Sequence, residues 1–125
     1  MAGTPPLRVV VCEGDETGQE LLEQSLRVLV PDVTGLDIEL LPFDLSLSAR
    51  RRTDNGIVRD AAAAMRATGL GLKAATITPP GADDVGSPNR ILREGVGGSV
   101  ILRTGRRIPG VSPIAPVVHP ISVVR

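Results

Sequence analysis

The chain has 125 residues, 14 of them basic and 14 acidic, so its formal net charge is zero. A balanced charge argues against a nucleic-acid or membrane-surface protein, because both classes normally carry a basic excess. The length suffices for one domain with a core, and Phe43 is the only aromatic residue, so aliphatic side chains must fill that core. Cys12 is the only cysteine, which excludes an internal disulfide and a cysteine metal cluster.

No secretory leader or membrane segment is recognisable in the sequence. The chain does not begin with a charged segment followed by a long apolar stretch, and no run of about 18 apolar residues occurs. We therefore expect a soluble cytoplasmic protein. Cys12 lies in an apolar run, so we expect its thiol to be buried and inert.

The first half of the chain predicts two strands with a helix between them. The apolar, β-branched run 7–12 predicts a strand that is buried on both faces. Leucines at helical spacing predict a helix from about residue 17 to 30, which Pro31 ends. The stretch 36–43 alternates apolar and polar residues, and Pro42 near its end favours an edge strand.

The middle of the chain predicts a loop, a helix and a short strand. The arginines at 50–52 are expected to form a solvated charge run in a polar loop. Thr53 or Asp54 then caps a helix that Gly69 closes. Residues 71–77 supply a third short strand.

The last part of the chain predicts another capped helix and two strands. Ser87 and Pro88 provide a hydroxyl cap and a proline in the first turn. Residues 100–102 and 121–124 are the last strand candidates, and the stretch 108–120 between them reads as a long connection. The alternation of strands and helices predicts an α/β protein with an at least partly parallel sheet.

Two familiar motifs are excluded by their context. Residues 69–74 match G-x-G-x-x-A, but a dinucleotide fingerprint follows a strand and opens a helix, whereas this one follows a helix and opens a strand. His119 is the only histidine and has no acidic or cysteine partner in its local sequence. The local sequence therefore argues against a Ser/His triad as well.

Four carboxylates can be read as a metal site or as solvated turn residues, and the second interpretation is favoured. Asp15, Glu16, Asp83 and Asp84 carry the oxygen ligands of a hard-metal site. Carboxylates beside Gly and Pro are, however, more often solvated turn residues. We therefore predict no metal-binding residues in this chain.

The stretch from Lys73 to Arg103 gathers cations, hydroxyls and an amide around a short helix. Asn89 and Arg93 are four residues apart and share a helix face, and a helix N-terminus attracts anions. Arginine forks on Arg103 and Arg125 are suited to carboxylates. From the pattern alone, a polyanion site and an ordinary capped helix with surface arginines both remain open.

At these residues the sequence resembles the NADP-dependent isocitrate dehydrogenases of the β-decarboxylating dehydrogenase family. The matching segments occur in family order, at nearly family spacing, over almost the whole chain. They are 14–16 (GDE), 60–62 (DAA), 73–79 (KAATITP), 87–89 (SPN), 97–100 (GGSV), and Pro120 with Arg125.

The resemblance implies roles for individual residues. Substrate binding falls to Thr78, Ser87, Asn89, Arg93, Arg103 and Arg125, with three arginines clamping the carboxylates of isocitrate. Cofactor binding falls to Lys73, Thr76 and Thr78. The intact family uses NADP with Mg²⁺ or Mn²⁺.

The sequence also departs from the family pattern. Asp83 and Asp84 stand in a shortened loop where a cofactor-side arginine is expected, which argues against NADP binding by this chain alone. One residue more separates Arg93 from Arg103 than in eukaryotic-like members. The family's catalytic tyrosine and lysine and its metal-binding aspartates come later in the sequence, whereas this chain has no tyrosine and only Lys73.

The resemblance therefore implies a partial, truncated dehydrogenase-like fold. Residues 1–96 correspond to the N-terminal part of a large α/β domain and 97–125 to the entry into a smaller one. The leading hypothesis is a substrate-binding segment of an oxidoreductase of the tricarboxylic acid cycle, inactive alone, with a complementing C-terminal chain or a homodimer as its assembly. The alternative is a catalytically dead tricarboxylate-binding module or a pseudo-subunit of a full-length homologue.

Overall fold

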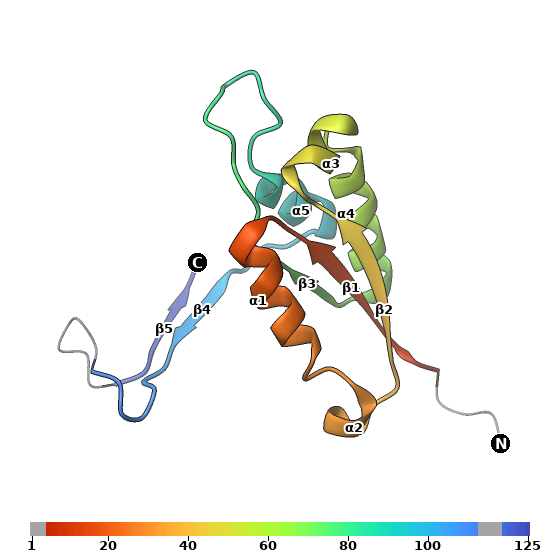
Figure 1. Cartoon of the computed structure of the whole chain (residues 1–125). Coiled ribbons are helices and arrows are strands. Elements are labelled where there is room, and N and C mark those ends of the chain that lie inside the picture. The colour runs from red at the N-terminus through yellow and green to blue at the C-terminus, as the bar shows by residue number, and fades with distance from the viewer. Residues whose placement is uncertain (1–4, 113–118) are drawn as a thin grey trace.

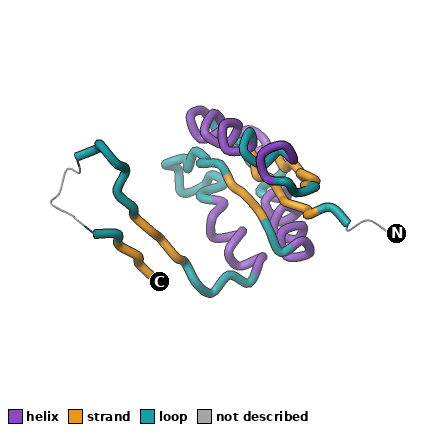
Figure 2. Tube along the Cα trace, turned by 90° about the horizontal axis from the view of Figure 1, so that it is seen from below, coloured by secondary structure: helices purple, strands orange, loops and turns teal. Residues whose placement is uncertain are grey.

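The computed structural model describes residues 5–112 and 119–125. It has a body in which helices enclose a small sheet, and a hairpin that extends to one side (Figures 1 and 2). In chain order the elements are β1 (Leu7–Glu13), α1 (Glu16–Leu26), α2 (Pro31–Thr34), β2 (Ile38–Asp44), α3 (Leu47–Arg52), α4 (Gly56–Thr68), β3 (Gly71–Lys73), α5 (Pro88–Val96), β4 (Leu102–Gly105) and β5 (Ile121–Val124).

The sheet of the body is parallel and has the strand order β2-β1-β3. The predicted first strand is confirmed, with residues 9–12 buried, and the predicted edge position of the second strand is confirmed for β2. Pro42 is tolerated there because an edge strand does not need every N–H in the ladder. The α/β class with a parallel sheet is thus confirmed, and the division at residue 96 stays a prediction.

Both faces of the central strand are covered. Val10 and Cys12 pack in one cluster with Val58 of α4 and Leu92 of α5, whereas Val11 packs on the opposite face with Leu22 of α1. Successive strand residues point to opposite faces, so a continuous apolar run is what a strand covered on both sides requires. Figure 1 shows α1 on one side of the sheet and α4 on the other.

Two predicted boundaries in the first half are wrong. The first helix ends at Leu26 rather than near residue 30, and residues 27–30 form a turn followed by a bend. Pro31 does not end this helix. It begins α2, because the first position of a helix needs no N–H donor and suits the fixed φ of proline.

The predicted polar loop at 50–52 is also wrong. These residues end α3, whose cap is Ser46: its hydroxyl accepts a hydrogen bond from the Ala49 N–H at 3.3 Å. Helix α4 then begins at Gly56 after Asn55, later than predicted, although the Thr53 hydroxyl accepts from the Ile57 N–H at 3.4 Å. Its predicted end at Gly69 is confirmed, because that glycine has a φ of 80°, a conformation that glycine adopts without steric cost.

The remaining elements differ from the prediction mainly in length and pairing. Strand β3 covers Gly71–Lys73 and stops short of residue 77. The candidate at 100–102 becomes β4, Leu102–Gly105, which pairs antiparallel with β5 in a separate two-stranded sheet. The predicted connection 108–120 joins these strands, and its residues 113–118 lie outside the described part of the chain.

Within residues 5–112 and 119–125, no helix has the length and apolar character needed to span a membrane.

Candidate functional site

Lys73 ends β3 and lies half-buried at the carboxyl edge of the sheet. Its Nζ donates hydrogen bonds to the Ala74 carbonyl oxygen at 2.8 Å and to Thr76 Oγ1 at 3.1 Å. Burial lowers the pKa of Lys73 from its ordinary value of 10.5, because loss of water disfavours the charged form. An ammonium has three donors, so Lys73 can hold a further oxygen beside Thr76.

The predicted cap of α5 is confirmed. The Ser87 hydroxyl accepts a hydrogen bond from the Asn89 N–H at 3.4 Å. Pro88 and Leu92 are buried and anchor the helix against the body, whereas Ser87, Asn89 and Arg93 are exposed. The amide and the guanidinium therefore project from the solvent side of a helix whose N-terminus carries a partial positive charge.

The hairpin brings Arg103 and Arg125 to one face. Arg103 is directly opposite Val123, and the Arg125 backbone exchanges two hydrogen bonds with Ile101 at 2.8 and 2.9 Å. Arg125 is thus two positions beyond the partner of Arg103 on the neighbouring strand. Such diagonal neighbours share a face and lie within reach of long side chains. Both arginines are exposed, so their forks are accessible to a dianion.

The structure thus groups the predicted residues in three pairs: Lys73 with Thr76, Asn89 with Arg93, and Arg103 with Arg125. Thr78 is exposed on the segment that follows β3. No hydrogen bond or ion pair among the described residues joins the α5 pair to the hairpin pair. The roles of all these residues stay predictions.

Arg50 is the residue that the sequence interpretation missed. It was expected in a solvated charge run, but its side chain is fully buried, while Arg51 and Arg52 are exposed. Its Nε donates to the Leu45 carbonyl at 3.0 Å, its Nη1 to the Gly86 carbonyl at 2.8 Å, and its Nη2 to the Ile77 carbonyl. No local pattern in the sequence separates Arg50 from the two exposed arginines that follow it.

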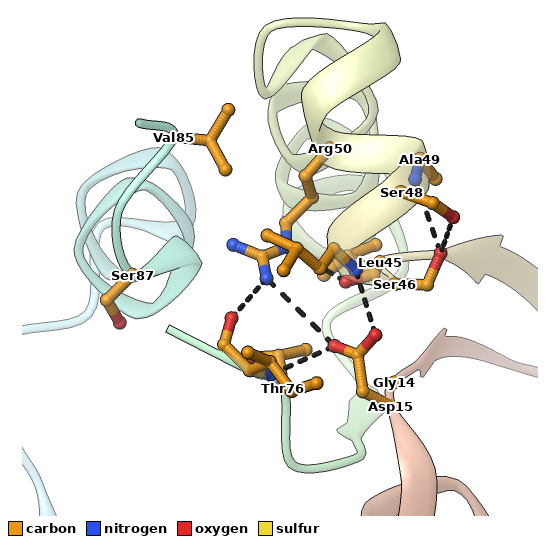
Figure 3. A network of polar contacts seen from close by, with 12 residues as sticks. Gly14, Asp15, Leu45, Ser46, Ser48, Ala49, Arg50, Thr76, Val85 and Ser87 are labelled. Carbon is orange, nitrogen blue, oxygen red and sulfur yellow. Dashed lines mark hydrogen bonds and ion pairs between the residues drawn. The ribbon is translucent and has the colours of Figure 1, made fainter. Parts of the chain in front are cut away.

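Asp15 joins the same network from the turn after β1. Its Oδ1 accepts from the Leu47 N–H and its Oδ2 from the Ile77 N–H, each at 2.9 Å. Its Oδ2 lies 4.0 Å from Arg50 Nη2, so the carboxylate is the nearest countercharge for the buried guanidinium. Figure 3 shows the Arg50 side chain directed from its helix toward Asp15 and the chain around Thr76.

Neighbouring strands and loops meet closely at this edge. A Cβ on Gly14 would lie 2.1 Å from the Ala75 carbonyl oxygen, closer than any real contact, and the Asp15 N–H donates to that oxygen at 3.1 Å. In parallel sheets the crevice beyond the carboxyl ends of the strands is the usual ligand position. Here Asp15 and Arg50 fill part of it with internal hydrogen bonds.

Asp84, another of the four carboxylates considered for a metal site, is held in an ion pair. Arg51 pairs with Asp84 through Nη2 and Oδ2 at 2.5 Å. The hydrogen bond from Arg51 lowers the pKa of Asp84 from its ordinary value of 3.8, since it stabilises the ionised form. Among the described residues, no three His, Cys, Asp or Glu side chains lie close enough to hold a metal ion. The residues present thus do not fit the divalent metal that the resemblance implies.

A dinucleotide is only partly accommodated. Lys73 lines a groove of about 230 Å³ between α1 and the segment that follows β3, together with Gly18, Leu22 and Ala75. Pockets for organic ligands usually hold about 300–1,000 Å³, so this groove is small for a whole dinucleotide. The ammonium of Lys73 and the hydroxyls of Thr76 and Thr78 suit contacts to phosphate or ribose oxygens. These residues would hold one part of NADP, which would accept a hydride when bound.

Comparison with known proteins gives one consistent set of relatives. No protein-family model matches the chain. The sequence is 35% identical over 100 residues to the mitochondrial NADP isocitrate dehydrogenase of Saccharomyces cerevisiae, covering 74% of this chain and 23% of that enzyme. It is 35% identical over 116 residues to the NADP isocitrate dehydrogenase of Sphingobium yanoikuyae, covering 82% and 28%.

A mycobacterial enzyme extends the match further along the chain. The sequence is 32% identical over 128 residues to NADP isocitrate dehydrogenase 1 of Mycobacterium bovis, covering 88% of this chain and 31% of that enzyme. The chain therefore spans between about a quarter and a third of the length of these relatives. The resemblance predicted from the sequence is confirmed: the chain is a relative of the NADP-dependent isocitrate dehydrogenases over most of its own length.

Proposed function

We propose that this chain provides the tricarboxylate-binding part of an isocitrate-dehydrogenase-like oxidoreductase. The observation that carries the proposal is helix α5, whose buried Pro88 and Leu92 leave Ser87, Asn89 and Arg93 exposed at and after a capped N-terminus. The relatives that the chain matches over most of its length are named isocitrate dehydrogenase.

The chemistry of the site suits a substrate with several carboxylates. One carboxylate accepts hydrogen bonds at the α5 N-terminus from the Ser87 hydroxyl and the Asn89 amide, where the helix dipole favours negative charge. Arg93 holds the same group or the next one. Arg103 and Arg125, which share a face of the hairpin, clamp another carboxylate as bidentate forks. Thr78 adds a hydroxyl from the segment after β3.

The proposal assigns binding to this chain and oxidation to an assembly with further residues. Oxidation at the hydroxyl carbon with loss of CO₂ requires an acid–base pair and a metal that polarises the carbonyl. The described carboxylates do not form a metal site, so the proposal places the catalytic step in the assembly. We propose that the chain alone is inactive and that Lys73, Thr76 and Thr78 contribute contacts to NADP only within the assembly.

The exposed hairpin favours an assembly over an isolated chain. Leu102 and Val124 are 62% and 69% exposed, and a two-stranded hairpin without a packed face is at best marginally stable in water. A complementing chain or a second copy would cover it. The rival function, a catalytically dead tricarboxylate-binding module or pseudo-subunit, uses the same binding residues. The cytoplasmic location stays a prediction.

Calorimetric titration with D-isocitrate tests the binding proposal. We expect binding to the wild type, and affinity reduced at least about tenfold in Arg93→Ala and in Arg103→Ala, because a charge-assisted hydrogen bond contributes about 1.5–3 kcal/mol. Arg90→Ala is the matched control, since Arg90 is exposed on the same helix and pairs with Glu94 at 2.7 Å. Absence of binding at millimolar isocitrate would overturn the proposal.

Turnover separates the two functions. The purified chain with isocitrate, NADP and Mg²⁺ is expected to reduce no NADP, and reduction by it would contradict the proposed inactivity. Activity that appears when a separately expressed C-terminal part of a relative is added would support the split oxidoreductase. Binding of isocitrate without activity in that mixture would favour the binding module.

A further inference from the structure

We infer that Arg50 is a positioning residue of the tricarboxylate site: its guanidinium fixes the segment that carries Thr76 and Thr78 relative to the cap at Ser87. The inference rests on the proposed function, because Arg50, which is outside the predicted binding set, is assigned the task of positioning the residues that bind the tricarboxylate. It explains why a full positive charge is kept inside a domain of this size.

The carbonyl groups that Arg50 holds come from both ends of one loop. Nη2 donates to the oxygen of Ile77, which directly precedes Thr78, and Nη1 donates at 2.8 Å to the oxygen of Gly86, which directly precedes Ser87. One rigid fork thus spans the two ends of the loop 78–86. Nε donates to Leu45 at 3.0 Å and fixes the direction of the fork.

Two further side chains support the same two ends. The Asp15 carboxylate accepts from the Ile77 N–H at 2.9 Å, and the Asn55 amide donates to the Val85 carbonyl at 2.9 Å. Arg50 and Asn55 are buried, at 0% and 6% exposure. Both ends of the loop therefore accept hydrogen bonds from buried side chains, whereas Asp84, in the loop between them, pairs with the exposed Arg51 of α3.

The binding side chains depend on this support because the packing around them does little to hold them in place. Thr78, Ser87, Asn89 and Arg93 are exposed, so packing around their side chains does not fix their separation. The positions of Thr78 and Ser87 follow from the backbone at Ile77 and Gly86, and the packed helix α5 carries Asn89 and Arg93 onward from Ser87. A lysine at position 50 would keep the charge but would lose the planar fork with donors in several directions.

The test compares Arg50→Lys with two controls that differ from it in one respect each. Arg52→Lys makes the same substitution on an exposed residue of the same helix. Val58→Ala removes buried apolar volume from α4 and lowers stability without touching the loop. Amide NMR spectra and D-isocitrate affinities are measured for all variants well below their melting temperatures.

The positioning role predicts a specific pattern. In Arg50→Lys the amide signals of Thr78, Ser87 and Asn89 shift, and isocitrate binds at least about tenfold more weakly, because the binding groups are no longer held in place before the ligand arrives. Val58→Ala and Arg52→Lys keep wild-type signals at these amides and wild-type affinity. A merely structural role would instead give Val58→Ala and Arg50→Lys the same loss of affinity at equal stability, and this result would overturn the inference.

The outcomes separate this inference from the proposed function. If wild-type protein binds no isocitrate, the proposed function fails, and unchanged amides at Thr78, Ser87 and Asn89 in Arg50→Lys would overturn the inference as well. If Arg50→Lys does not fold, Asp15→Ala replaces it, because it removes the countercharge and the acceptor for Ile77. That variant is expected to shift Thr78 more than Ser87, and equal shifts at both would contradict the assignment.

Discussion

The body and the β4–β5 hairpin hold their parts of the proposed site in different ways. In the body, α5 is packed through Leu92 against a core that includes Val10, Cys12 and Val58. In the hairpin, every residue of β4 and β5 is exposed, and cross-strand backbone hydrogen bonds supply the order. Figure 2 shows the hairpin beside the enclosed sheet rather than on it.

This difference shows which residues of the proposed binding site are preorganised before a ligand binds. Asn89 and Arg93 stand on a packed helix, so their relative direction is set by folding. Arg103 and Arg125 share a face of a hairpin without a core of its own, and such a hairpin is marginal in water. We expect the first pair to be preorganised and the second pair to become ordered through a partner or a polyanion.

Leu45→Ala should have the largest effect on stability. Leu45 is fully buried, and truncation of a buried leucine costs about 2–5 kcal/mol. Leu102→Ala in β4 is the matched change on an exposed residue, and its cost should stay within about 0.5 kcal/mol. Urea unfolding followed by circular dichroism measures both. Equal losses would show that the hairpin has a core after all.

Cys12 should make the body lose stability at alkaline pH. Burial raises the pKa of Cys12 from 9.0 to about 11, so the unfolded chain releases its thiol proton first as the pH rises. The contribution of Cys12 to the free energy of unfolding is fully present below pH 9 and is lost as the pH rises from 9 to 11. The loss is up to about 3 kcal/mol, because the pKa differs by two units between the folded and unfolded states.

The measurement for Cys12 is the difference between wild type and Cys12→Ala in urea unfolding across this pH range. The difference is needed because burial lowers the pKa of Lys73, which changes stability in the opposite direction. Parallel curves for the two proteins would contradict a buried thiol. We also expect iodoacetamide to label the thiol slowly in the native protein and fast in urea.

Gly14→Ala should strain the carboxyl edge of the sheet. The added Cβ would meet the Ala75 carbonyl oxygen at 2.1 Å, and forced overpacking typically costs about 1–3 kcal/mol. Gly81→Ala is the control, since its Cβ would meet only the Asp84 Cβ at 3.8 Å. Thermal unfolding compares them, and a harmless Gly14→Ala would mean that the turn after β1 is not tightly closed.

Asp84→Asn should have the smallest effect, because Asp84 of the loop 78–86 pairs with an Arg51 side chain that is 54% exposed. At neutral pH the melting temperature is expected to stay almost unchanged, since exposed pairs contribute little. The pKa of Asp84 is lowered by Arg51, so its contribution is present above pH 3.8 and disappears as the pH falls further. Melting curves at pH 7 and pH 3 check this, and a large loss at pH 7 would reveal a structural pair.

The sequence predicted the elements whose signals are local. The β-branched run of β1, Gly69 after α4 and the Ser87–Pro88 cap each carry their own signal within a few residues. The end of α1 at Leu26 is followed by neither glycine nor proline, and the short helix α3 has only its Ser46 cap as a local signal. Sequence spacing alone therefore placed these two elements wrongly.

The site residues named from the sequence stay a prediction, and the buried side chain that supports their segments was not predicted. Ser87, Asn89 and Arg93 follow from a helical spacing and a resemblance. Arg50 binds carbonyl groups 27 and 36 residues further along the chain, and nothing in an arginine run distinguishes a buried arginine from a solvated one. The shared face of Arg103 and Arg125 likewise depends on a hairpin register that no local motif specifies.

The most direct test of the central claim is titration of ¹⁵N-labelled protein with D-isocitrate, followed by amide NMR. Because the α5 cap is preorganised, we predict saturable shifts at Ser87, Asn89 and Arg93, accompanied by ordering of the amides at Arg103 and Arg125. Shifts that are absent from the α5 N-terminus at millimolar isocitrate, or that appear only in the hairpin, would contradict the account.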